Sequence, residues 1–348
     1  MTDLEIQRDV PLAPLTTLEL GGPARFFARV ADTETLLAAL RWAREEGHEA
    51  VVLGGGSNLI VPDEGYPGLV IHMAIGDIDF KDGGRVEVGA GVPWEVVVDG
   101  AVTRGWAGLE CLTGIPGSTG ATPIQNVGAY GQEVSEVIAR VLVVDRESLA
   151  LGDLAPEACE FGYRDSMFKR EPGHYVVFGV HFALRTDGAG TVRYAELEKN
   201  VPRSASLGEI RSKVLDLRRR KSMVVDPDDP NRRSAGSFFL NPVVTSAEAD
   251  RVAALAVAEG LAPNIASVPR YPTASGEVKL AAGWLIEKSG IAKGTRRGAV
   301  GLSSKHALAL IHHGGGTTTE LLSFADEVRA RVKDRFGISL QREPRLLT

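Results

Sequence analysis

Cysteine is scarce in this sequence of 348 residues, which contains only Cys111 and Cys159. Two cysteines make no disulfide framework, and their spacing is not that of zinc ligands. The seven histidines form no HExxH or similar metal-binding pattern. We therefore predict a protein without disulfides and without a bound metal, because a chain of this length buries enough surface to fold without such staples.

Long apolar runs and an excess of positive charge are also missing. No run approaches the roughly 20 apolar residues of a membrane helix. The 39 basic residues are outnumbered by 45 acidic ones, for a net charge of −6, and this balance argues against a nucleic-acid surface. The first residues, MTDLEIQRDVP, are polar and acidic, unlike a secretory signal. We predict a cytoplasmic protein that binds neither membranes nor nucleic acids.

Helix and strand patterns alternate along the chain. An apolar face behind the cap residue Asp32 predicts a helix over 31–46, and a strand follows over 49–53. A hairpin is expected over 79–91 and a second helix over 93–105. Later signals are strands over 137–145 and 174–184 and the capping boxes Ser206–Glu209, Thr245–Glu248 and Thr317–Glu320. This order of elements predicts an α+β fold of about two or three domains.

A glycine-rich loop, Gly54-Gly55-Gly56-Ser57-Asn58, follows the strand expected over 49–53. Backbone N–H groups without a neighbouring Cβ can wrap a pyrophosphate. The dinucleotide-binding fingerprint would need a glycine at position 59, which is Leu59, and a helix after it, whereas a β-run follows. No P-loop lysine is present either. For this loop alone, the favoured interpretation is a glycine-rich hairpin connection, with phosphate binding as the alternative.

A second glycine-rich loop occupies residues 108–131. Its sequence, GLECLTGIPGSTGATPIQNVGAYG, has six glycines and no periodicity, and a loop this long inside a compact domain is usually functional. It offers backbone donors, hydroxyls and the amides of Gln125 and Asn126 together. Two such loops in one α+β domain, without the helix of a Rossmann fold, indicate a dinucleotide held mainly by loops.

Six segments in order along the chain carry a resemblance to a known family. They are LGGGSNLIV, IPGSTGATPIQNVGAYGQE, FGYRDSMFK, AGSFFLNPVV, YPTASGEVKLAAGWLIEKSG and the C-terminal LQREP. Each is a weak string alone, but six in this order are specific, and they extend from about Thr16 to Glu343. Over nearly its whole length, the chain resembles the UDP-N-acetylenolpyruvoylglucosamine reductases.

The resemblance implies a fold and a division into domains. The fold is α+β, with a two-subdomain FAD-binding module of the vanillyl-alcohol-oxidase (PCMH) type and a C-terminal α+β substrate-binding domain. We expect the first FAD-binding subdomain over 1–75, the second over 76–220 and the substrate-binding domain over 221–348, whose last residues return to the flavin site. The turn-rich segment Asp226–Ser234 is predicted to be a linker or a mobile loop.

The resemblance also implies a reaction and its cofactors. UDP-N-acetylglucosamine enolpyruvate, a small-molecule substrate, is reduced to UDP-N-acetylmuramate in bacterial peptidoglycan precursor synthesis. Hydride passes from NADPH to non-covalent FAD and on to C3 of the enolpyruvyl group, and a proton reaches C2. No metal and no obligate protein partner are implied. The expected FAD-binding residues are Gly54, Gly55, Gly56, Ser57, Asn58, Pro116, Gly117, Gly120, Ala121, Thr122, Gln125, Asn126, Gly128, Ala129 and Tyr130.

Three residues match the catalytic positions of the family. Arg164 would polarise the substrate carboxylate through its guanidinium fork, although from the residues alone it is explained by a structural pair with Asp165. Ser237 would donate the proton to C2, although a serine in this setting is usually a turn or cap residue. Glu343 would polarise the carboxylate together with Arg164. It keeps the family's spacing, while Arg342 stands where proline is usual.

Further residues match positions that bind the UDP-sugar. Tyr194 follows the turn-like segment 186–190, which is consistent with a mobile lid and with the subclass that has a tyrosine-bearing substrate loop. Lys221 ends a basic run whose simpler explanation is charge at the end of a helix. At position 306, where other members often carry glutamine, this chain has histidine. The full set is Tyr163, Tyr194, Lys221, Asn241, Tyr271, Lys293 and His306.

Two other functions compete with this prediction. An FAD-dependent oxidase of the same fold would often attach its flavin to a His or Cys near the glycine loops. Neither residue type occurs in 53–61 or 113–131, and Cys111 lies just outside. A nonenzymatic binder of flavin or of a nucleotide sugar would not need the three catalytic positions together.

Overall fold

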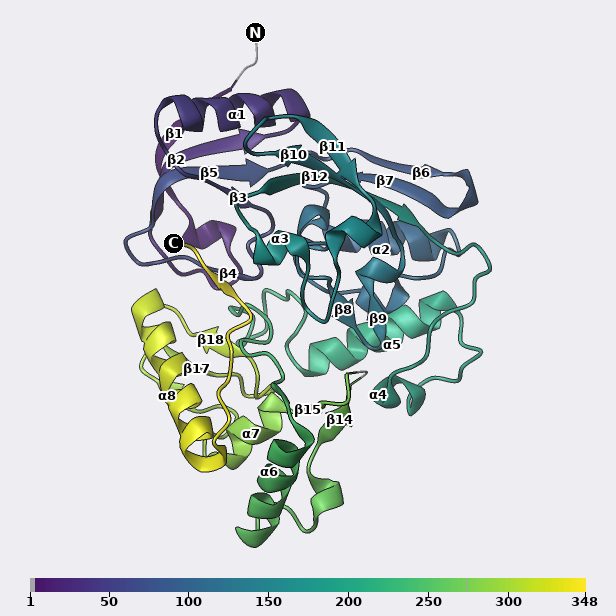
Figure 1. Ribbon diagram of the computed structural model, residues 1–348, viewed down its shortest axis with the longest axis vertical. Helices are drawn as coiled ribbons and strands as arrows, with labels where there is room; N and C mark the ends of the chain where they lie inside the picture. Colours follow the sequence, from purple (N-terminus) through teal and green to yellow (C-terminus); the bar gives the residue numbers. More distant parts are fainter. Residues whose placement is uncertain (1–3, 274) are drawn as a thin grey trace. The chain divides into compact units, whose positions relative to one another are not determined.

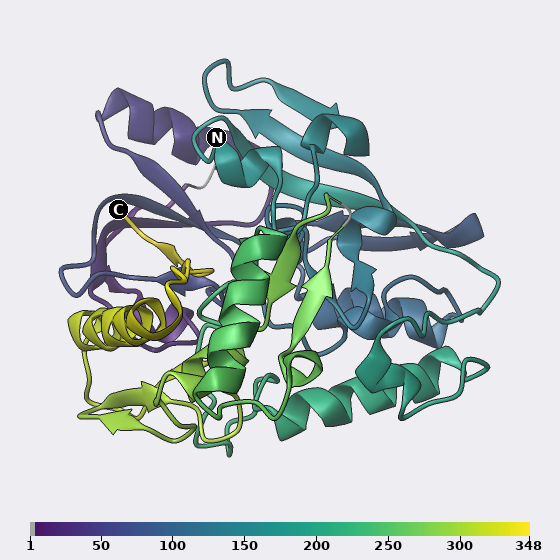
Figure 2. The same cartoon turned by 60° about the horizontal axis from the view of Figure 1, so that its bottom comes forward.

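The computed structural model of the protein describes residues 4–273 and 275–348 and is drawn in Figures 1 and 2. The chain divides into two compact units. Unit 1 consists of the chain up to Pro11 with Pro23–Gly56 and Tyr66–Val225, and unit 2 consists of Leu12–Gly22, Ser57–Gly65 and Asp226–Thr348. Two short N-terminal segments therefore belong to the unit that is built mainly from C-terminal residues.

The first sheet of unit 1 has the strand order β1 (Gln7–Pro11), β2 (Pro23–Val30), β5 (Tyr66–Met73) and β3 (Ala50–Leu53). β5 pairs in parallel with β2 and β3, and β1 is antiparallel to β2. The helix α1 (Thr33–Glu45) lies against this sheet (Figure 1) and buries Leu36 and Leu40 with Ile71 of β5. Asp32 caps α1 by accepting the Thr35 N–H at 2.7 Å, which confirms the predicted helix and its cap.

The second sheet of unit 1 is antiparallel, in the order β11 (Leu151–Leu154), β10 (Ile138–Asp145), β12 (Tyr175–Ala183), β7 (Arg85–Gly89) and β6 (Ile78–Lys81). Successive side chains along these strands point to opposite faces of the sheet, and one of these faces is buried against α2 (Trp94–Thr103). The rings of Trp94 and Phe182, both almost fully buried, have centroids 5.9 Å apart. α5 (Leu207–Arg220) contacts α2. These elements confirm the hairpin, helix and strands predicted for this part of the chain.

Small sheets and helices surround the main core of unit 2. The sheets have the orders β13 (Val243–Val244), β15 (Val278–Leu280), β14 (Arg270–Pro272) and β16 (Arg296–Arg297), β17 (Val300–Leu302), β18 (Leu310–His312). The helices include α6 (Ser246–Ala258), α7 (Ala282–Lys288) and α8 (Thr318–Phe336). Figure 2 shows α6 beside β15, and α8 contacts β17 and β18. Phe238, Phe239 and Phe336 are fully buried in this core.

The glycine loop that follows β3 does not connect a hairpin. β3 belongs to the first sheet of unit 1, whereas β4 (Leu59–Ile60) pairs in parallel with β19 (Arg345–Leu346) in unit 2. The loop 54–58 therefore carries the chain from one unit into the other, and the hairpin interpretation of its sequence is wrong. The β-run expected after the loop is present as β4, but a strand of two residues carries no periodicity that could identify its partner near the other end of the sequence.

The segment Asp226–Ser234 is hydrogen-bonded to other parts of unit 2. The Oδ1 of Asn231 accepts the backbone N–H of Ser304 at 2.9 Å, and Asp229 forms an ion pair with Lys305 at 2.9 Å. The segment is thus an integral part of unit 2 rather than a linker.

None of the helices in the described part of the chain combines the length and the apolar character needed to cross a membrane. Over the same residues, no three His, Cys, Asp or Glu side chains are placed to share a metal ion. Cys111 and Cys159 are buried free thiols. Burial raises the pKa of both, that of Cys159 to about 11. At neutral pH these thiols are protonated and pack like small apolar side chains.

Helix α8 begins with two caps. Thr317 and Glu320 form the predicted capping box, and Asp63 accepts the N–H of Thr318 at 2.7 Å and that of Thr319 at 2.9 Å. Burial opposes the ionisation of Asp63. Hydrogen bonds from the Thr319 hydroxyl and from these two N–H groups outweigh that effect and lower the pKa of the carboxyl.

We expect Asp63→Ala to lower the free energy of unfolding at neutral pH by about 1 kcal/mol, the usual contribution of a helix cap. Because the folded-state pKa lies below the unfolded value, this stabilisation is present above the unfolded pKa and is lost as the pH falls through the folded pKa. Urea unfolding of variant and wild type at neutral and acidic pH measures both effects. Asp334→Ala, at an exposed position of α8, is the control. A deficit that persisted in acid would contradict this role of the carboxylate.

Candidate functional site

Two glycine loops of unit 1 lie against each other. A Cβ on Gly55 would come 2.6 Å from the Cα of Gly117, and a Cβ on Gly54 would come 2.4 Å from the Oγ of Ser118. The Ser118 hydroxyl can turn aside but the backbone of Gly117 cannot, so only glycine at position 55 lets the loop after β3 approach the loop 114–131 this closely. The structure thus brings together the backbones of two segments of the predicted cofactor site.

The place where these loops meet fits a phosphate-containing cofactor. Ser118 is 6% exposed, and its Oγ has no hydrogen-bond partner among the described residues. A buried hydroxyl without a partner costs free energy unless a ligand supplies one, and a pyrophosphate oxygen beside the glycine backbones would do so. Ser118 is not among the residues predicted from the sequence. The string Gly117-Ser118-Thr119-Gly120 is the signal by which it could have been found.

The other predicted cofactor residues shape the second loop. Thr119–Ala121 form a 3-10 turn in which the Gly120 N–H donates to the carbonyl of Ala90 at 2.9 Å, and the Thr122 hydroxyl donates back to Thr119 at 2.8 Å. Gly128 and Ala129 form β8, which pairs with β9 (Gln132–Glu133). Gly54–Gly56 and Pro116–Tyr130 belong to unit 1, whereas Ser57 and Asn58 belong to unit 2.

Arg164 lies in a tight turn whose backbone is strained. Gly162 and Asp165 exchange backbone hydrogen bonds of 3.0 and 3.2 Å across the turn, and Arg164 has a left-handed φ of 54°. Its Nη2 donates to the carbonyl of Gly128 at 2.5 Å. The predicted carboxylate-binding arginine therefore contacts the loop of the predicted cofactor site. Asp165, its expected partner in a purely structural role, forms an ion pair with Arg170.

Tyr130, Tyr194 and Lys221 form a cluster next to the end of α5. The two rings meet edge to face with centroids 5.6 Å apart, and the Lys221 Nζ lies 5.9 Å from the centroid of the Tyr130 ring. Burial raises the pKa of Tyr130 to about 12, so its phenol is neutral. Lys221 also pairs with Glu196 at 2.6 Å, and a substrate phosphate would have to compete with this carboxylate. Tyr163, another predicted substrate residue, is exposed next to Arg164.

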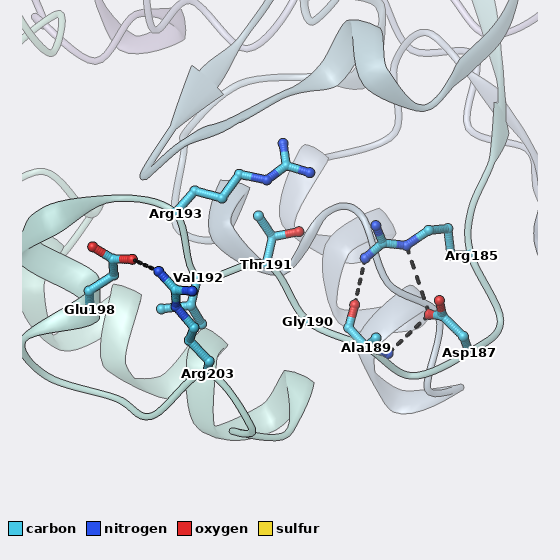
Figure 3. A pocket seen from close by; sticks show the side chains of 9 residues that line it. All are labelled: Arg185, Asp187, Ala189, Gly190, Thr191, Val192, Arg193, Glu198 and Arg203. Carbon is cyan, nitrogen blue, oxygen red and sulfur yellow. Dashed lines mark hydrogen bonds and ion pairs between the residues drawn. The ribbon is translucent and has the colours of Figure 1, made fainter.

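A cavity of about 470 Å³ lies beside the chain segment that leads into Tyr194 (Figure 3). Arg185 pairs with Asp187 at 3.8 Å and Arg203 pairs with Glu198 at 2.9 Å, so the acidic neighbours engage these cations. The cavity is lined by Arg185, Asp187, Ala189, Gly190, Thr191, Val192, Arg193, Glu198 and Arg203. The cavity therefore lies along the predicted lid segment.

Unit 2 brings Ser237 and Glu343 onto neighbouring segments. The Glu343 N–H donates to the carbonyl of Phe238 at 3.0 Å, and Phe239 forms a β-bridge with Arg342. Arg342 stands where the family usually has proline, and its backbone forms part of the contact between the two segments. The predicted proton donor and the predicted carboxylate are therefore each within one residue of this junction.

The other predicted substrate residues of unit 2 lie on separate elements. The Oδ1 of Asn241 accepts a backbone N–H at the start of α7 at 2.9 Å. Tyr271 is half exposed on β14, and Lys293 pairs with Glu287 at 3.6 Å. His306 lies in the loop before β18. The Phe238 N–H donates to the carbonyl of Leu308 at 2.7 Å, which brings the loop of His306 against the segment that follows Ser237.

Comparison with known proteins identifies the family of this chain. A model of the UDP-N-acetylenolpyruvoylglucosamine reductase C-terminal domain matches residues 228–347, and a model of an FAD binding domain matches residues 24–149. A UDP-N-acetylenolpyruvoylglucosamine reductase from Thermobifida fusca is 47% identical over 346 residues, which cover 97% of this chain and 96% of the relative. This chain belongs to the UDP-N-acetylenolpyruvoylglucosamine reductase family.

Other members support the same assignment. The reductase of Streptomyces avermitilis is 46% identical over 97% of this chain and 93% of its own length, and that of Mycolicibacterium smegmatis is 44% identical over 99% and 96%. The crystal structure of the Thermus caldophilus reductase matches with a TM-score of 0.69 at 27% identity, over 99% of this chain and 100% of the other. Family membership confirms the predicted α+β fold, the FAD cofactor and the enzyme class, an oxidoreductase acting on a CH–CH group with NADP.

Proposed function

We propose that this reductase converts UDP-N-acetylglucosamine enolpyruvate to UDP-N-acetylmuramate, with NADPH as the hydride donor, in cytoplasmic peptidoglycan precursor synthesis. The observation that carries the proposal is the 47% identity to the Thermobifida fusca reductase over nearly the whole of both chains. A shared fold alone would not support a shared reaction. Sequence identity that spans both the FAD-binding part and the C-terminal domain supports a shared reaction.

The chain's own residues prepare the substrate and supply its proton. Bound FAD supplies the hydride-transfer chemistry between NADPH and C3 of the enolpyruvyl group. As hydride arrives, negative charge builds up on the neighbouring carboxylate, and Arg164 stabilises it through two parallel hydrogen bonds. Glu343 acts with Arg164, as a protonated acid or through water. Ser237 holds the proton for C2, and a hydroxyl can donate it because the developing aci-carboxylate is strongly basic.

We assign the FAD phosphates to the meeting point of the two glycine loops. The Gly54–Gly56 and Gly117 backbones leave room there, and the Ser118 hydroxyl is buried and in need of a partner. The UDP-sugar is assigned to the tyrosine and lysine cluster of unit 1 and to the substrate residues of unit 2 named above.

The absorption band of the flavin tests this function directly. The purified protein is held anaerobically, NADPH is added first, and UDP-N-acetylglucosamine enolpyruvate second. We expect NADPH to bleach the band and the sugar to restore it. Recovery only on admission of oxygen would favour the oxidase alternative. A colourless protein that takes up no added FAD would contradict the proposal at its base.

Tyr194→Ala is expected to weaken binding of the UDP-sugar roughly tenfold, because one aromatic contact contributes on the order of 1 kcal/mol beyond its buried area. The affinity for FAD should be nearly unchanged. Titration of the oxidised enzyme with substrate measures the first, and FAD titration of the apoprotein measures the second. Leu151→Ala, at an exposed position of β11 in the same unit, is the control. Unchanged substrate affinity would remove Tyr194 from the substrate site.

A further inference from the structure

The side chain of Asn126 is used inside the protein. Asn126 is 1% exposed, and its Nδ2 donates both to the Oε2 of Glu133 at 2.8 Å and to the carbonyl of Gly162 at 2.9 Å. Its Oδ1 accepts the N–H of Ser135 at 3.2 Å. Both amide hydrogens are therefore engaged, and the side chain has no donor to offer a ligand. Any contact of Asn126 with the cofactor would therefore have to come from its backbone.

These bonds tie the turn of Arg164 to the cofactor loop. Asn126 holds the carbonyl of Gly162, the first residue of that turn. Lys169 holds the other end, because its Nζ donates to the carbonyl of Arg164 at 2.7 Å. The Ser166 hydroxyl adds a bond of 2.7 Å to the carbonyl of Ile124 in the same loop. The left-handed backbone of Arg164 is unfavourable for a non-glycine residue and persists only where neighbours hold it.

We propose that Asn126 and Lys169 are positioning residues that hold the Arg164 guanidinium in place for the substrate carboxylate. Asn126 sets the distance between the turn and the cofactor loop, and Lys169 stabilises the strained peptide at Arg164. The bond from Arg164 to the carbonyl of Gly128 then anchors one side of the guanidinium on that loop. The inference rests on the proposed function, in which Arg164 acts on the substrate and not in the reaction with NADPH.

The test replaces each positioning residue in the full-length, FAD-loaded enzyme. Asn126→Gly removes the amide but keeps a residue that suits the φ of 43°, and Lys169→Met keeps the stem but removes the donor. We expect recovery of the absorption band by UDP-N-acetylglucosamine enolpyruvate to slow about 100-fold, the effect of misplacing a reacting group by about 1 Å. Bleaching by NADPH and the affinity of the apoprotein for FAD should stay within about twofold of wild type.

Two controls separate positioning from general damage. Asp9→Gly replaces an exposed left-handed residue of β1, and Lys333→Met replaces an exposed lysine of α8; neither should alter any of the three measurements. Asn126→Asp should be at least as harmful as Asn126→Gly, because it sets a carboxylate against that of Glu133. Adding Glu133→Gln relieves that repulsion but does not restore a donor to the carbonyl of Gly162, so recovery by the sugar should stay slow, whereas a role limited to the contact with Glu133 would be rescued.

The outcomes distinguish this inference from the function on which it rests. If wild type itself shows no recovery on addition of the sugar, the proposed function fails. If wild type recovers and both variants match it, the positioning role is overturned. Loss of FAD affinity in step with activity, or equal slowing by NADPH and by the sugar, would overturn it in favour of cofactor binding.

Discussion

Ser237→Ala is expected to slow recovery of the flavin absorption band by the UDP-sugar by about 10²- to 10⁴-fold, the usual contribution of a positioned general acid. Bleaching by NADPH should keep its rate, because that half of the reaction transfers no proton to C2. Ser237 is next to the residue whose carbonyl accepts the Glu343 N–H, so the proposed proton donor lies beside the segment that carries the proposed carboxylate. Anaerobic rapid mixing, with NADPH first and the sugar second, measures the two rates separately.

Two further variants sharpen this experiment. Ser237→Cys puts back a proton donor, with an ordinary pKa near 8.5, and should regain part of the lost rate. Ser246→Ala removes a hydroxyl of the same unit, at the start of α6, and should leave both rates unchanged. Equal loss of the two rates in Ser237→Ala, with no gain in Ser237→Cys, would show that the hydroxyl supports the structure and does not donate the proton.

Local patterns predict much of this fold because they depend on neighbours in the sequence. A helix cap needs one side chain and the next turn, and Asp32, Thr245 and Thr317 act as the pattern predicts. The pairing of β4 with β19 joins residues from opposite ends of the chain. Each of these strands has two residues, so neither carries a periodicity that could reveal its partner.

The site shows the same limit at the level of single side chains. A match to family motifs identifies Arg164 and Asn126 as residues of interest, but residue type alone does not say what an amide binds. Asn126 lies in the cofactor loop, and only its three side-chain hydrogen bonds reveal that it ties the turn of Arg164 to that loop. The importance of Ser118 depends on a buried hydroxyl that has no hydrogen-bond partner among the described residues, which residue type does not indicate.

Gly55→Ala is expected to weaken FAD binding towards the upper end of about 5- to 150-fold, the equivalent of the 1–3 kcal/mol that overpacking costs. The new Cβ would stand 2.6 Å from the Cα of Gly117 and 3.0 Å from its carbonyl carbon. Backbone atoms cannot rotate away as a side chain can, so the two loops must separate. In the apoprotein that separation relieves the strain, but FAD phosphates held between the loops require them to close again.

The loss of FAD affinity should depend on whether the new methyl group contacts the backbone, a side chain or nothing. Gly54→Ala is expected to be milder, because its Cβ meets the Ser118 Oγ, which can turn aside. Gly152→Ala is the neutral control, since a Cβ at this position of β11 meets nothing within 4 Å. FAD titration and thermal unfolding of the apoproteins measure binding and stability separately. If Gly55→Ala lowered the unfolding temperature but left FAD affinity intact, the loops would serve the fold. If the loop backbones are shaped around the cofactor, Gly55→Ala weakens FAD binding and leaves the unfolding temperature of the apoprotein nearly unchanged.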